Sequence, residues 1–335
     1  MKPEQKSLKI GAAVILFAIA LRFLGGGLFS DVAALRSDSG IASVLLYAGT
    51  GRVYSAEKPA PAPSEPPPAA EPTVPEATQP SPTEISPPDL SSEDAVLVSV
   101  TNHPGYDIDV EAMLEMPLRW DLTTQSPAVL IIHSHTCESY ENTEGYIPSD
   151  PYRTMDSQYN MVSIGAYLAE CLRQRGVSVI HDTTIHDYPS YNDAYPQSRK
   201  TIEQYLETYP SICLVLDIHR DAYEDDSGKQ VRNTISIDGK SASRIMLVAG
   251  TNAGGQSHPN WRDNLSIAVK LQTVLQQLYP GLCRNLTMRS SAFNQDLAPG
   301  ALLIEIGTAG DTRQDALYAA ELLSDGIAAL AHGTI

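Results

Sequence analysis

Hydrophobic runs alternate with amphipathic stretches along the chain beyond about residue 95. Four runs that are apolar almost throughout predict buried strands: AVLIIHSH, VSVIHD, SICLVLDIH and ALLIEIGT. Three further runs, rich in β-forming residues, predict additional strands: VRNTISIDG, SRIMLVAG and CRNLTMRS. Helices are predicted between the strands, at residues 157–172, in SRKTIEQYLETYP, at residues 261–279 and in the closing stretch TRQDALYAAELLSDGIAALAHG.

The alternation of strands and helices indicates an α/β domain. Ile164, Leu168 and Leu172 recur at helical spacing, and Gly176 ends that helix before the next strand. Because the strands are continuously apolar, we predict a mostly parallel, mixed sheet with helices on both faces. Sheets of this kind place their sites at the carboxyl ends of strands. The folded domain is predicted to span residues 95–335.

The first 30 residues have a different pattern. MKPEQKSLK carries three lysines, and an uncharged apolar stretch follows, interrupted by Arg22. A spanning helix needs roughly 20 residues, which residues 8–29 supply if Arg22 extends toward the membrane interface. No obvious cleavage site follows, so residues 1–30 predict a cytoplasmic tail and an uncleaved transmembrane signal anchor, with a removed signal peptide as the alternative. The lysines place the tail in the cytoplasm and the rest of the chain outside the membrane.

Residues 31–54 are assigned to a membrane-proximal segment, and residues 55–94 to a proline-rich linker. The linker is dominated by Pro, Glu, Ala, Ser and Thr, so it cannot bury enough apolar surface to fold. At about 3.1 Å per residue, roughly 35 such residues span on the order of 100 Å. That reach suits a disordered tether that holds an outer domain away from a membrane.

Composition narrows the classes of partner and site. The chain of 335 residues carries a formal net charge of −17, which disfavours contact with a phosphate backbone, so no nucleic-acid partner is predicted. Four cysteines stand alone without a C-x-x-C pair, which argues against a disulfide scaffold or a zinc finger. Of these, Cys171 and Cys213 are predicted to be core residues.

Three predicted strands end in ionisable residues. VLIIHSH ends on His133 and His135, ICLVLDIH ends on Asp217 and His219, and LLIEIG carries Glu305. Strand residues two apart point to the same face, so the first two histidines converge if the chain stays extended. An ionised glutamate within an apolar strand is costly to bury without a partner.

Histidine and carboxylate are the ligands that catalytic zinc takes, commonly three from the protein with one position left for water. His133, His135, Glu138, His219 and Glu305 can supply such a set together with a carboxylate that accepts the water's proton. The alternative is that each histidine is a buried imidazole satisfied at a strand end. The chain has no G-x-S-x-G, G-x-x-x-x-G-K-[ST] or H-E-x-x-H motif, so the serine-hydrolase, P-loop and zincin hypotheses lack their signatures.

Other candidates have simpler explanations. Cys137, close to two histidines, is interpreted as a bystander or an extra ligand rather than a nucleophile. The remaining histidines are expected in solvated or turn positions: His103 and His258 before prolines, His181 and His186 in a loop, and His332 at the end of the last helix.

Four ordered segments of the domain resemble the stage II sporulation protein P family of endospore-forming bacteria. They are VLIIHSHTCESY, YPSYNDAYPQSR, LVLDIHRDA and NQDLAPGALLIEIGT. The resemblance covers about residues 100–335 and the anchor-and-linker arrangement before them. The family usually has H-T-H-T-x-E-S-Y in the first segment, where this chain has Ser134 and Cys137, both small residues.

The resemblance implies a zinc-dependent N-acetylmuramoyl-L-alanine amidase with a fold like that of zinc amidases related to zinc exopeptidases. Such an enzyme cuts the amide between muramic acid and the stem peptide of peptidoglycan, and the family is also credited with cleaving peptide cross-links. It further implies wall remodelling outside the cytoplasmic membrane during engulfment. The implied partner is stage II sporulation protein D, a glycan-cleaving enzyme.

Carried onto this chain, the family pattern implies that zinc is held by His133 or His135 together with Glu138 and His219. Glu305 would be the catalytic base. Related amidases take a glutamate from the helix after the first strand, and here that helix opens with Asp156, Ser157, Gln158 and Tyr159, none of them glutamate. Glu138 is therefore the expected substitute, with Asp156 as the alternative.

Arg220 follows His219 and is expected to bind a stem-peptide carboxylate or to stabilise an oxyanion. A salt bridge of Arg220 with Asp217 or Asp221 is the alternative. Asn294 and Gln295 are expected to hydrogen-bond the substrate backbone.

Two other functions fit parts of the same pattern. A metal-free domain that tethers membrane to wall and recruits a partner enzyme would use the same linker. A zinc carboxypeptidase or deacetylase acting on the wall polymer would share the metal and differ only in the bond that is cut.

Overall fold

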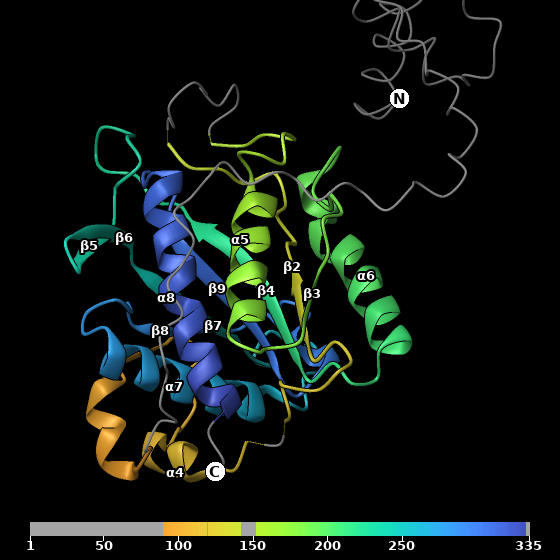
Figure 1. Ribbon diagram of the computed structural model, residues 1–335, viewed down its shortest axis with the longest axis vertical. Coiled ribbons are helices and arrows are strands. Elements are labelled where there is room, and N and C mark those ends of the chain that lie inside the picture. The colour runs from red at the N-terminus through yellow and green to blue at the C-terminus, as the bar shows by residue number, and fades with distance from the viewer. Residues whose placement is uncertain (1–89, 119, 142–151, 333–335) are drawn as a thin grey trace, which may run out of the picture. The chain divides into compact units, whose positions relative to one another are not determined.

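A computed structural model describes residues 90–118, 120–141 and 152–332 (Figure 1). The predicted signal anchor (1–30), the membrane-proximal segment (31–54) and nearly all of the linker (55–94) lie outside the described residues. Within the described ranges, no helix is both long enough and apolar enough to cross a membrane.

The described residues contain one seven-stranded sheet, in the order β1-β8-β7-β9-β4-β2-β3. All neighbouring strands are parallel except β7 and β9, which are antiparallel. The predicted mostly parallel, mixed sheet is therefore confirmed. Its strands are β1 (Val100–Asn102), β2 (Val129–Ile132), β3 (Val179–His181), β4 (Leu214–Asp221), β7 (Ile245–Gly250), β8 (Leu286–Arg289) and β9 (Ala301–Thr308).

The helices and a small second sheet complete the described domain. The second sheet pairs β5 (Thr234–Ile237) with β6 (Lys240–Ser243) as an antiparallel hairpin. The helices are α4 (Val110–Glu115), α5 (Met161–Gln174), α6 (Ala194–Thr208), α7 (Trp261–Leu278) and α8 (Arg313–His332). Three 3₁₀ helices are η1 (Ser92–Leu97), η2 (Tyr191–Asp193) and η3 (Gln295–Leu297).

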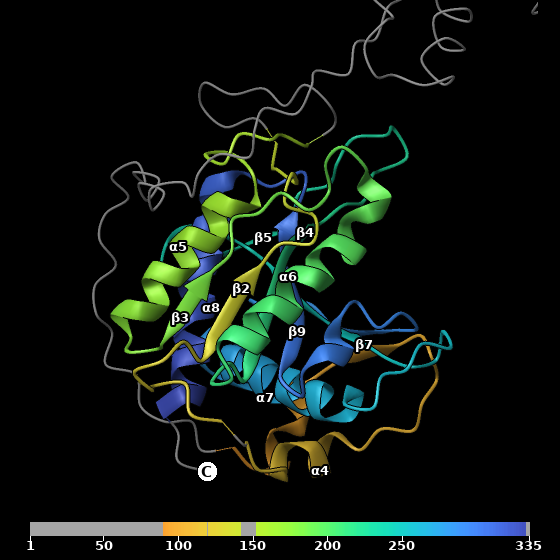
Figure 2. The ribbon, with the colours of Figure 1, turned by 90° about the vertical axis from the view of Figure 1, so that its right-hand side faces the viewer.

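Alternation along the strands divides the buried residues between the two faces of the sheet. In β2, Val129 and Ile131 belong to the large core cluster under α5, α7 and α8. Leu130 and Ile132 belong to a smaller cluster that also contains Ile202 of α6. Figure 2 shows α5 and α8 together on one side of the sheet, away from α6. Helices therefore cover both faces, as the sequence predicts.

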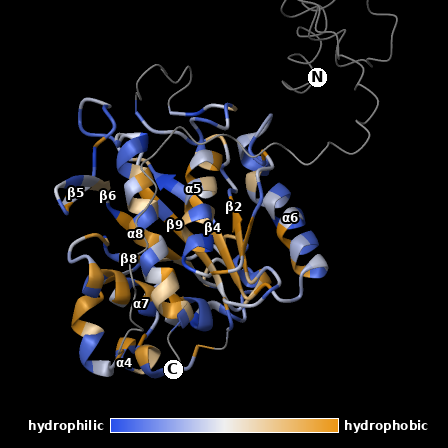
Figure 3. Ribbon diagram, in the orientation of Figure 1, coloured by the Kyte–Doolittle hydropathy of each residue, from blue (hydrophilic) through white to orange (hydrophobic). Residues whose placement is uncertain are grey.

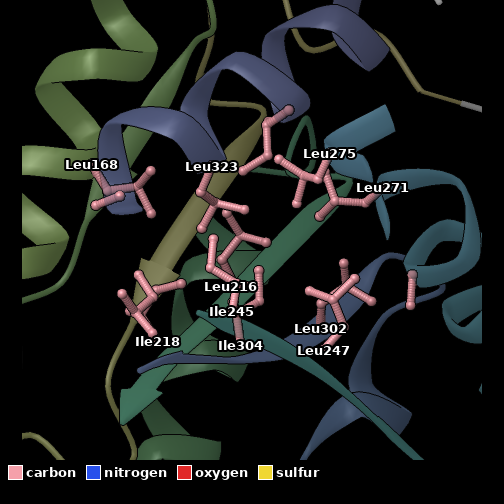
Figure 4. Packing of buried hydrophobic residues seen from close by; sticks show 14 of the residues in the cluster. Leu168, Leu216, Ile218, Ile245, Leu247, Leu271, Leu275, Leu302, Ile304 and Leu323 are labelled. Atoms are coloured by element: carbon pink, nitrogen blue, oxygen red, sulfur yellow. The ribbon is translucent and has the colours of Figure 1, made fainter. Parts of the chain in front are cut away.

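The large cluster joins the sheet to its helices. Figure 4 shows Leu216 of β4 and Ile304 of β9 packed with Leu323 of α8 and Leu275 of α7. Removing such side chains from water is favourable by roughly 25 cal/mol per Å² of apolar area. The central strands are correspondingly hydrophobic, and the hydrophilic positions lie mainly on the outer surfaces of the helices and in loops (Figure 3).

The pairing of β4 with β9 places polar side chains on the α6 face. His219 lies opposite Glu305 in this register. Leu216 and Ile218 of β4 point into the large cluster, so Asp217 and His219 point the other way. The carboxyl end of β4 therefore directs its ionisable residues toward α6.

Lys270 of α7 is fully buried, and its ammonium donates a hydrogen bond to the carbonyl of Leu114 at the end of α4. Burial lowers the pKa of Lys270 from its usual 10.5. The native state therefore binds this proton more weakly than the unfolded chain does. The resulting destabilisation is present at neutral pH and disappears as the pH rises toward 10.5.

We predict that Lys270→Met removes this contribution to the pH dependence. Between pH 7 and pH 10, the free energy of unfolding of the wild type should rise relative to that of the variant, measured by urea denaturation. Lys200→Met, at an exposed position of α6, is the matched control and should keep the wild-type slope. Equal slopes for wild type and Lys270→Met would contradict the prediction.

Candidate active site

The two histidines of the opening motif diverge because the chain turns after β2 ends at Ile132. Residues 134–137 form a turn, in which the backbone N–H of Glu138 donates to the carbonyl of His135 at 3.1 Å. The rule that strand residues two apart share a face does not apply across a turn. The expected convergence of His133 and His135, which required an extended chain, therefore does not occur.

His133 points to the α5 face and uses both ring nitrogens within the protein. Its Nδ1 donates to the carbonyl of Ile218 at 2.9 Å, because a carbonyl only accepts. Its Nε2 lies 2.9 Å from Nε2 of His181, which must then be the donor. Burial lowers the pKa of His133 to about 4, so the ring is neutral near pH 7. This arrangement leaves no free nitrogen for a metal ion.

The histidines expected in a loop support this pair. His181 belongs to β3, and His186 is buried and donates from Nδ1 to the carbonyl of His133 at 2.8 Å. His186 and His258 lie outside helices and strands, as expected, but both are buried rather than solvated. The sequence pattern gave no indication that His181 and His186 bond to His133, since these partners are far apart in sequence.

His135, Glu138, His219 and Glu305 come together on the α6 face. The rings of His135 and His219 lie edge to face with centroids 5.5 Å apart. Oε2 of Glu138 lies 3.6 Å from Nδ1 of His219, and Glu305 faces His219 across the β4–β9 pair. Four residues that the sequence nominated are thus neighbours, while His133 is not among them.

Charges of both signs determine the ionisation of this cluster. Burial alone would raise the pKa of Glu138, but Arg220 and His219 lower it to about 2. Burial opposes a charge on His219, yet Asp217 and Glu138 raise its pKa well above the usual value. Burial raises the pKa of Glu305 to about 8. Glu138 is therefore ionised near neutral pH, and a cation bound beside Glu305 would lower the pKa of Glu305 again by favouring its ionised form.

Arg220 is buried and bonds to the backbone at Ser139 and Tyr152. Its guanidinium donates from Nε to the carbonyl of Ser139 at 3.0 Å and from Nη2 to the carbonyl of Tyr152 at 2.8 Å. Its Nη1 lies 3.5 Å from Oε1 of Glu138. The side chain therefore fixes Glu138 and the backbone on both sides of residues 142–151.

The aspartates of β4 have other partners. Asp221 pairs with Arg284 at 2.7 Å. Oδ1 of Asp217 lies 2.7 Å from Nε2 of His219, in an ion-pair contact whose angle does not make a hydrogen bond. Among the ion pairs of the described residues, neither aspartate forms the salt bridge with Arg220 that was the alternative expectation.

Ser134 holds Asp217 in place. Its backbone N–H donates to Oδ1 of Asp217 at 2.8 Å, and its hydroxyl donates to Oδ2 at 2.6 Å. The same hydroxyl lies 2.7 Å from the hydroxyl of Ser198 in α6. The first motif and α6 are thus connected through the aspartate that faces His219.

Two tyrosines that the sequence interpretation did not single out flank the cluster. The ring of Tyr191 stacks on His135 with centroids 4.2 Å apart and an interplanar angle of 9°. Tyr195 meets His135 edge to face at 5.4 Å and lies parallel to His219 at 6.4 Å. Both belong to the segment YPSYNDAYPQSR. The family resemblance therefore contained these tyrosines, although no hydrophobic periodicity singled them out.

Several other candidates lie outside the cluster. Burial raises the pKa of the Cys137 thiol to about 12, so the thiolate that a nucleophile or ligand needs is scarce. Asp156 is exposed and accepts from the backbone N–H of Gln158 at 3.0 Å. Gln295 is buried with its amide bound to β7, which leaves it unable to reach a substrate backbone.

Three buried atoms of the cluster have no hydrogen-bond partner among the described residues: Nδ1 of His135, Nε2 of His219 and Oε2 of Glu305. Buried polar atoms are nearly always hydrogen-bonded. Here Nε2 of His219 has only its ion-pair contact with Asp217, and Nδ1 of His135 has only a 3.9 Å contact with Oδ2 of Asp187, so these neighbouring side chains are suited to a further ligand. Imidazole nitrogen and carboxylate oxygen are the donors that catalytic zinc takes. The residues present therefore fit zinc chemically.

The donors are close together, but they are not in ligand geometry. Within the described ranges, no three His, Cys, Asp or Glu side chains hold their donor atoms in position for a metal ion. The assignment of individual ligands thus rests on the buried atoms that make no hydrogen bond and on the hydrogen-bond partners of each histidine ring.

The sequence matches the family model described as stage II sporulation protein P over residues 55–328. The curated stage II sporulation protein P of Bacillus subtilis (strain 168) is 27% identical over 219 residues, which cover 61% of this chain and 51% of the relative. The chain thus spans about half the length of that relative.

Two solved structures to which the chain is similar are named as amidases. The N-acetylmuramoyl-L-alanine amidase AmiC2 of Nostoc punctiforme is 13% identical with a TM-score of 0.37, covering 60% of this chain and 94% of its own. The CwlD amidase from Clostridioides difficile, solved with the GerS lipoprotein, is 13% identical with a TM-score of 0.36, covering 61% and 94%. TM-scores below 0.5 support no conclusion about function.

Gly165 of α5 packs closely against the His133–His181 pair, so a substitution at this position tests that packing. A Cβ at this position would lie 2.4 Å from Nε2 of His133 and 2.5 Å from Nε2 of His181. We predict that Gly165→Ala destabilises the domain by about 1–3 kcal/mol, although alanine is otherwise the better helix former. Urea unfolding measures the change. Glu170→Ala, at an exposed position of α5, should stay within about 0.5 kcal/mol of the wild type.

Equal or greater stability of Gly165→Ala would show that the two rings do not pack against α5 as described.

Proposed function

The chain belongs to the stage II sporulation protein P family, and we propose that it is a membrane-anchored, zinc-dependent peptidoglycan hydrolase of spore formation. The proposed reaction is that of an N-acetylmuramoyl-L-alanine amidase, which cuts the amide between muramic acid and the stem peptide. Cleavage of peptide cross-links, and action during engulfment, belong to the same proposal. Family membership supports the wall polymer as substrate.

The observation that carries the chemistry is the group of three buried atoms without hydrogen bonds, on His135, His219 and Glu305. A metal-free tether has no use for such atoms, since each is costly to bury. We assign His135, Glu138 and His219 as zinc ligands. His133 is left out because both its ring nitrogens are engaged.

Bound zinc would supply Lewis acidity, which makes water acidic near neutral pH and polarises a carbonyl group. The side chains of this protein carry the remaining steps. Glu305 takes the proton of the attacking water at Oε2 and delivers it to the leaving amide nitrogen. Water thereby adds hydroxide to the carbonyl carbon and hydrogen to the amine, and the C–N bond breaks.

The surrounding contacts keep these groups in place. Asp217, itself held by Ser134, fixes the ring of His219 from one side. Arg220 holds Glu138 and the two loop carbonyls. The predicted contact of Arg220 with a substrate carboxylate or oxyanion stays a prediction.

The zinc content of variants shows whether His133 or His135 is the ligand. We expect purified wild-type protein to bind about one zinc ion per chain, and His135→Ala and His219→Ala to lose it, measured by elemental analysis. His133→Asn should retain zinc, because the asparagine amide can still donate to the carbonyl of Ile218. Loss of zinc in His133→Asn with retention in His135→Ala would reverse the assignment. A folded, zinc-free wild type would favour the tether.

Activity tests the role of Glu305. We expect Glu305→Gln to retain zinc and to lose about 10²–10⁴-fold in the rate of stem-peptide release from purified wall. Mass analysis of the products identifies the bond cut, which also separates the amidase from a carboxypeptidase or deacetylase. Glu170→Gln, on the exposed side of α5, is the matched control and should be fully active. Undiminished activity of Glu305→Gln would rule out this role.

Membrane attachment is proposed from the sequence of residues 1–30. We expect the full chain in the membrane fraction with the domain outside the cytoplasmic membrane, and a chain lacking residues 1–30 in the soluble fraction. Persistence of the shortened chain in the membrane fraction would contradict the proposed anchor. The resemblance also supports stage II sporulation protein D as the partner that cleaves the glycan.

A further inference from the structure

A cavity of about 550 Å³ opens beside the cluster on the α6 face. Tyr195 forms part of its wall and is also in contact with His135 and His219. The volume lies within the range of about 300–1,000 Å³ that is usual for small-molecule sites. A group bound in this cavity would therefore lie next to the proposed site of bond cleavage.

Two aromatic rings line the cavity. The centroids of Tyr195 and Phe293 lie 5.7 Å apart with an interplanar angle of 55°. Both side chains are partly exposed, so their faces remain available to a ligand. Aromatic faces bind weakly polarised C–H surfaces while a polar rim supplies hydrogen bonds. Here the rim consists of Gln256, Ser257, Ser291 and Asn294.

The cavity carries no unpaired positive charge. Arg199 is held by Asp296 in a two-point contact, with distances of 3.0 Å and 2.9 Å between nitrogen and oxygen atoms. The guanidinium of Arg199 is also 3.1 Å from Glu203. Its charge is thus neutralised twice. A site for a stem peptide would need a free cation for the peptide carboxylates, so the lining favours a neutral ligand.

The aromatic wall is held in a strained conformation. Phe293 and Asn294 both have positive φ angles, of 51° and 56°. This backbone region costs a residue such as phenylalanine roughly 1–2 kcal/mol, whereas asparagine tolerates it, and strain of this kind is characteristic of binding sites. The side chain of Asn294 donates to the carbonyl of Tyr195 at 2.9 Å, which joins the two sides of the cavity.

The loop that carries Phe293 is clamped onto β7. The amide of Gln295 accepts from the N–H of Gly250 at 2.8 Å and donates to the carbonyl of Val248 at 2.8 Å. A Cβ at Gly250 would lie 2.6 Å from the carbonyl oxygen of Ala292, so only glycine permits this approach. The ring of Phe293 is therefore preorganised rather than ordered by a ligand.

We propose that this cavity binds an N-acetylated pyranose of the glycan strand, adjacent to the amide that is cut. The pyranose has an apolar face that fits the two rings, and neutral hydroxyl and amide groups that fit the rim. The proposal rests on the proposed function for the identity of the polymer. Sugar binding itself is measured without turnover, so its outcome is independent of hydrolysis.

Titration calorimetry with chitotetraose, a tetramer of N-acetylglucosamine, tests the site. The full-length wild type should bind, and Phe293→Asn should bind about tenfold more weakly, because the stacking surface is lost. Asparagine tolerates the left-handed backbone, so the loop should keep its conformation. Phe293→Tyr retains a ring and should bind like the wild type. Tyr209→Ala, beyond the far end of α6 from Tyr195, is the control and should also bind normally.

Kinetics provide a second measurement on the same variants. With wall fragments that carry several disaccharides, Phe293→Asn should raise KM about tenfold and leave kcat nearly unchanged.

Three results would overturn the inference. They are no binding of chitotetraose by the wild type, equal binding by Phe293→Asn, and displacement of the sugar by the tripeptide L-Ala–γ-D-Glu–L-Lys with equal loss of both in the variant. The last result would assign the cavity to the peptide. Absence of amide cleavage with normal sugar binding would count against the proposed function alone and support the cavity assignment.

Discussion

The pairing of β4 with β9 is the constraint on which the rest of the structure depends. Its register sets His219 beside Glu305, and alternation along both strands turns these side chains toward α6. A shift of one residue would direct them into the apolar cluster under α5 and α8, where an ionised group has no partner. The main-chain hydrogen bonds of the sheet thus decide where the charges lie.

Charges of opposite sign alternate within the cluster that this register assembles. Arg220 faces Glu138, Glu138 faces His219, and His219 faces Asp217. Removing one member of such a buried set typically costs 3–5 kcal/mol, since its partner loses its compensation. Three buried atoms of the cluster still make no hydrogen bond among the described residues. The same arrangement therefore accounts for the stability of the cluster and for the metal site proposed there.

The aromatic side chains extend the site beyond the reacting groups. Tyr195 contacts the histidines on one side and Phe293 on the other, so it connects the cluster with the neighbouring cavity. The loop that carries Phe293 is fixed by β7 rather than by a ligand. If a glycan unit binds there, as proposed, a rigid wall of this kind would lower the entropy lost in positioning the neighbouring bond at the reacting centre.

Local pattern in the sequence determined most of the strands, the longer helices, the mixed sheet and the kinds of residue at the strand ends, whereas the short β1, β6 and α4 were not predicted. These features depend on periodicity and composition within about ten residues, which the chain itself displays. The choice between His133 and His135 was decided only by tertiary structure. It depends on the turn after β2, on His181 of β3 and on the space that Gly165 of α5 leaves. Contacts between segments so distant in sequence have no periodicity, so only the folded chain reveals them.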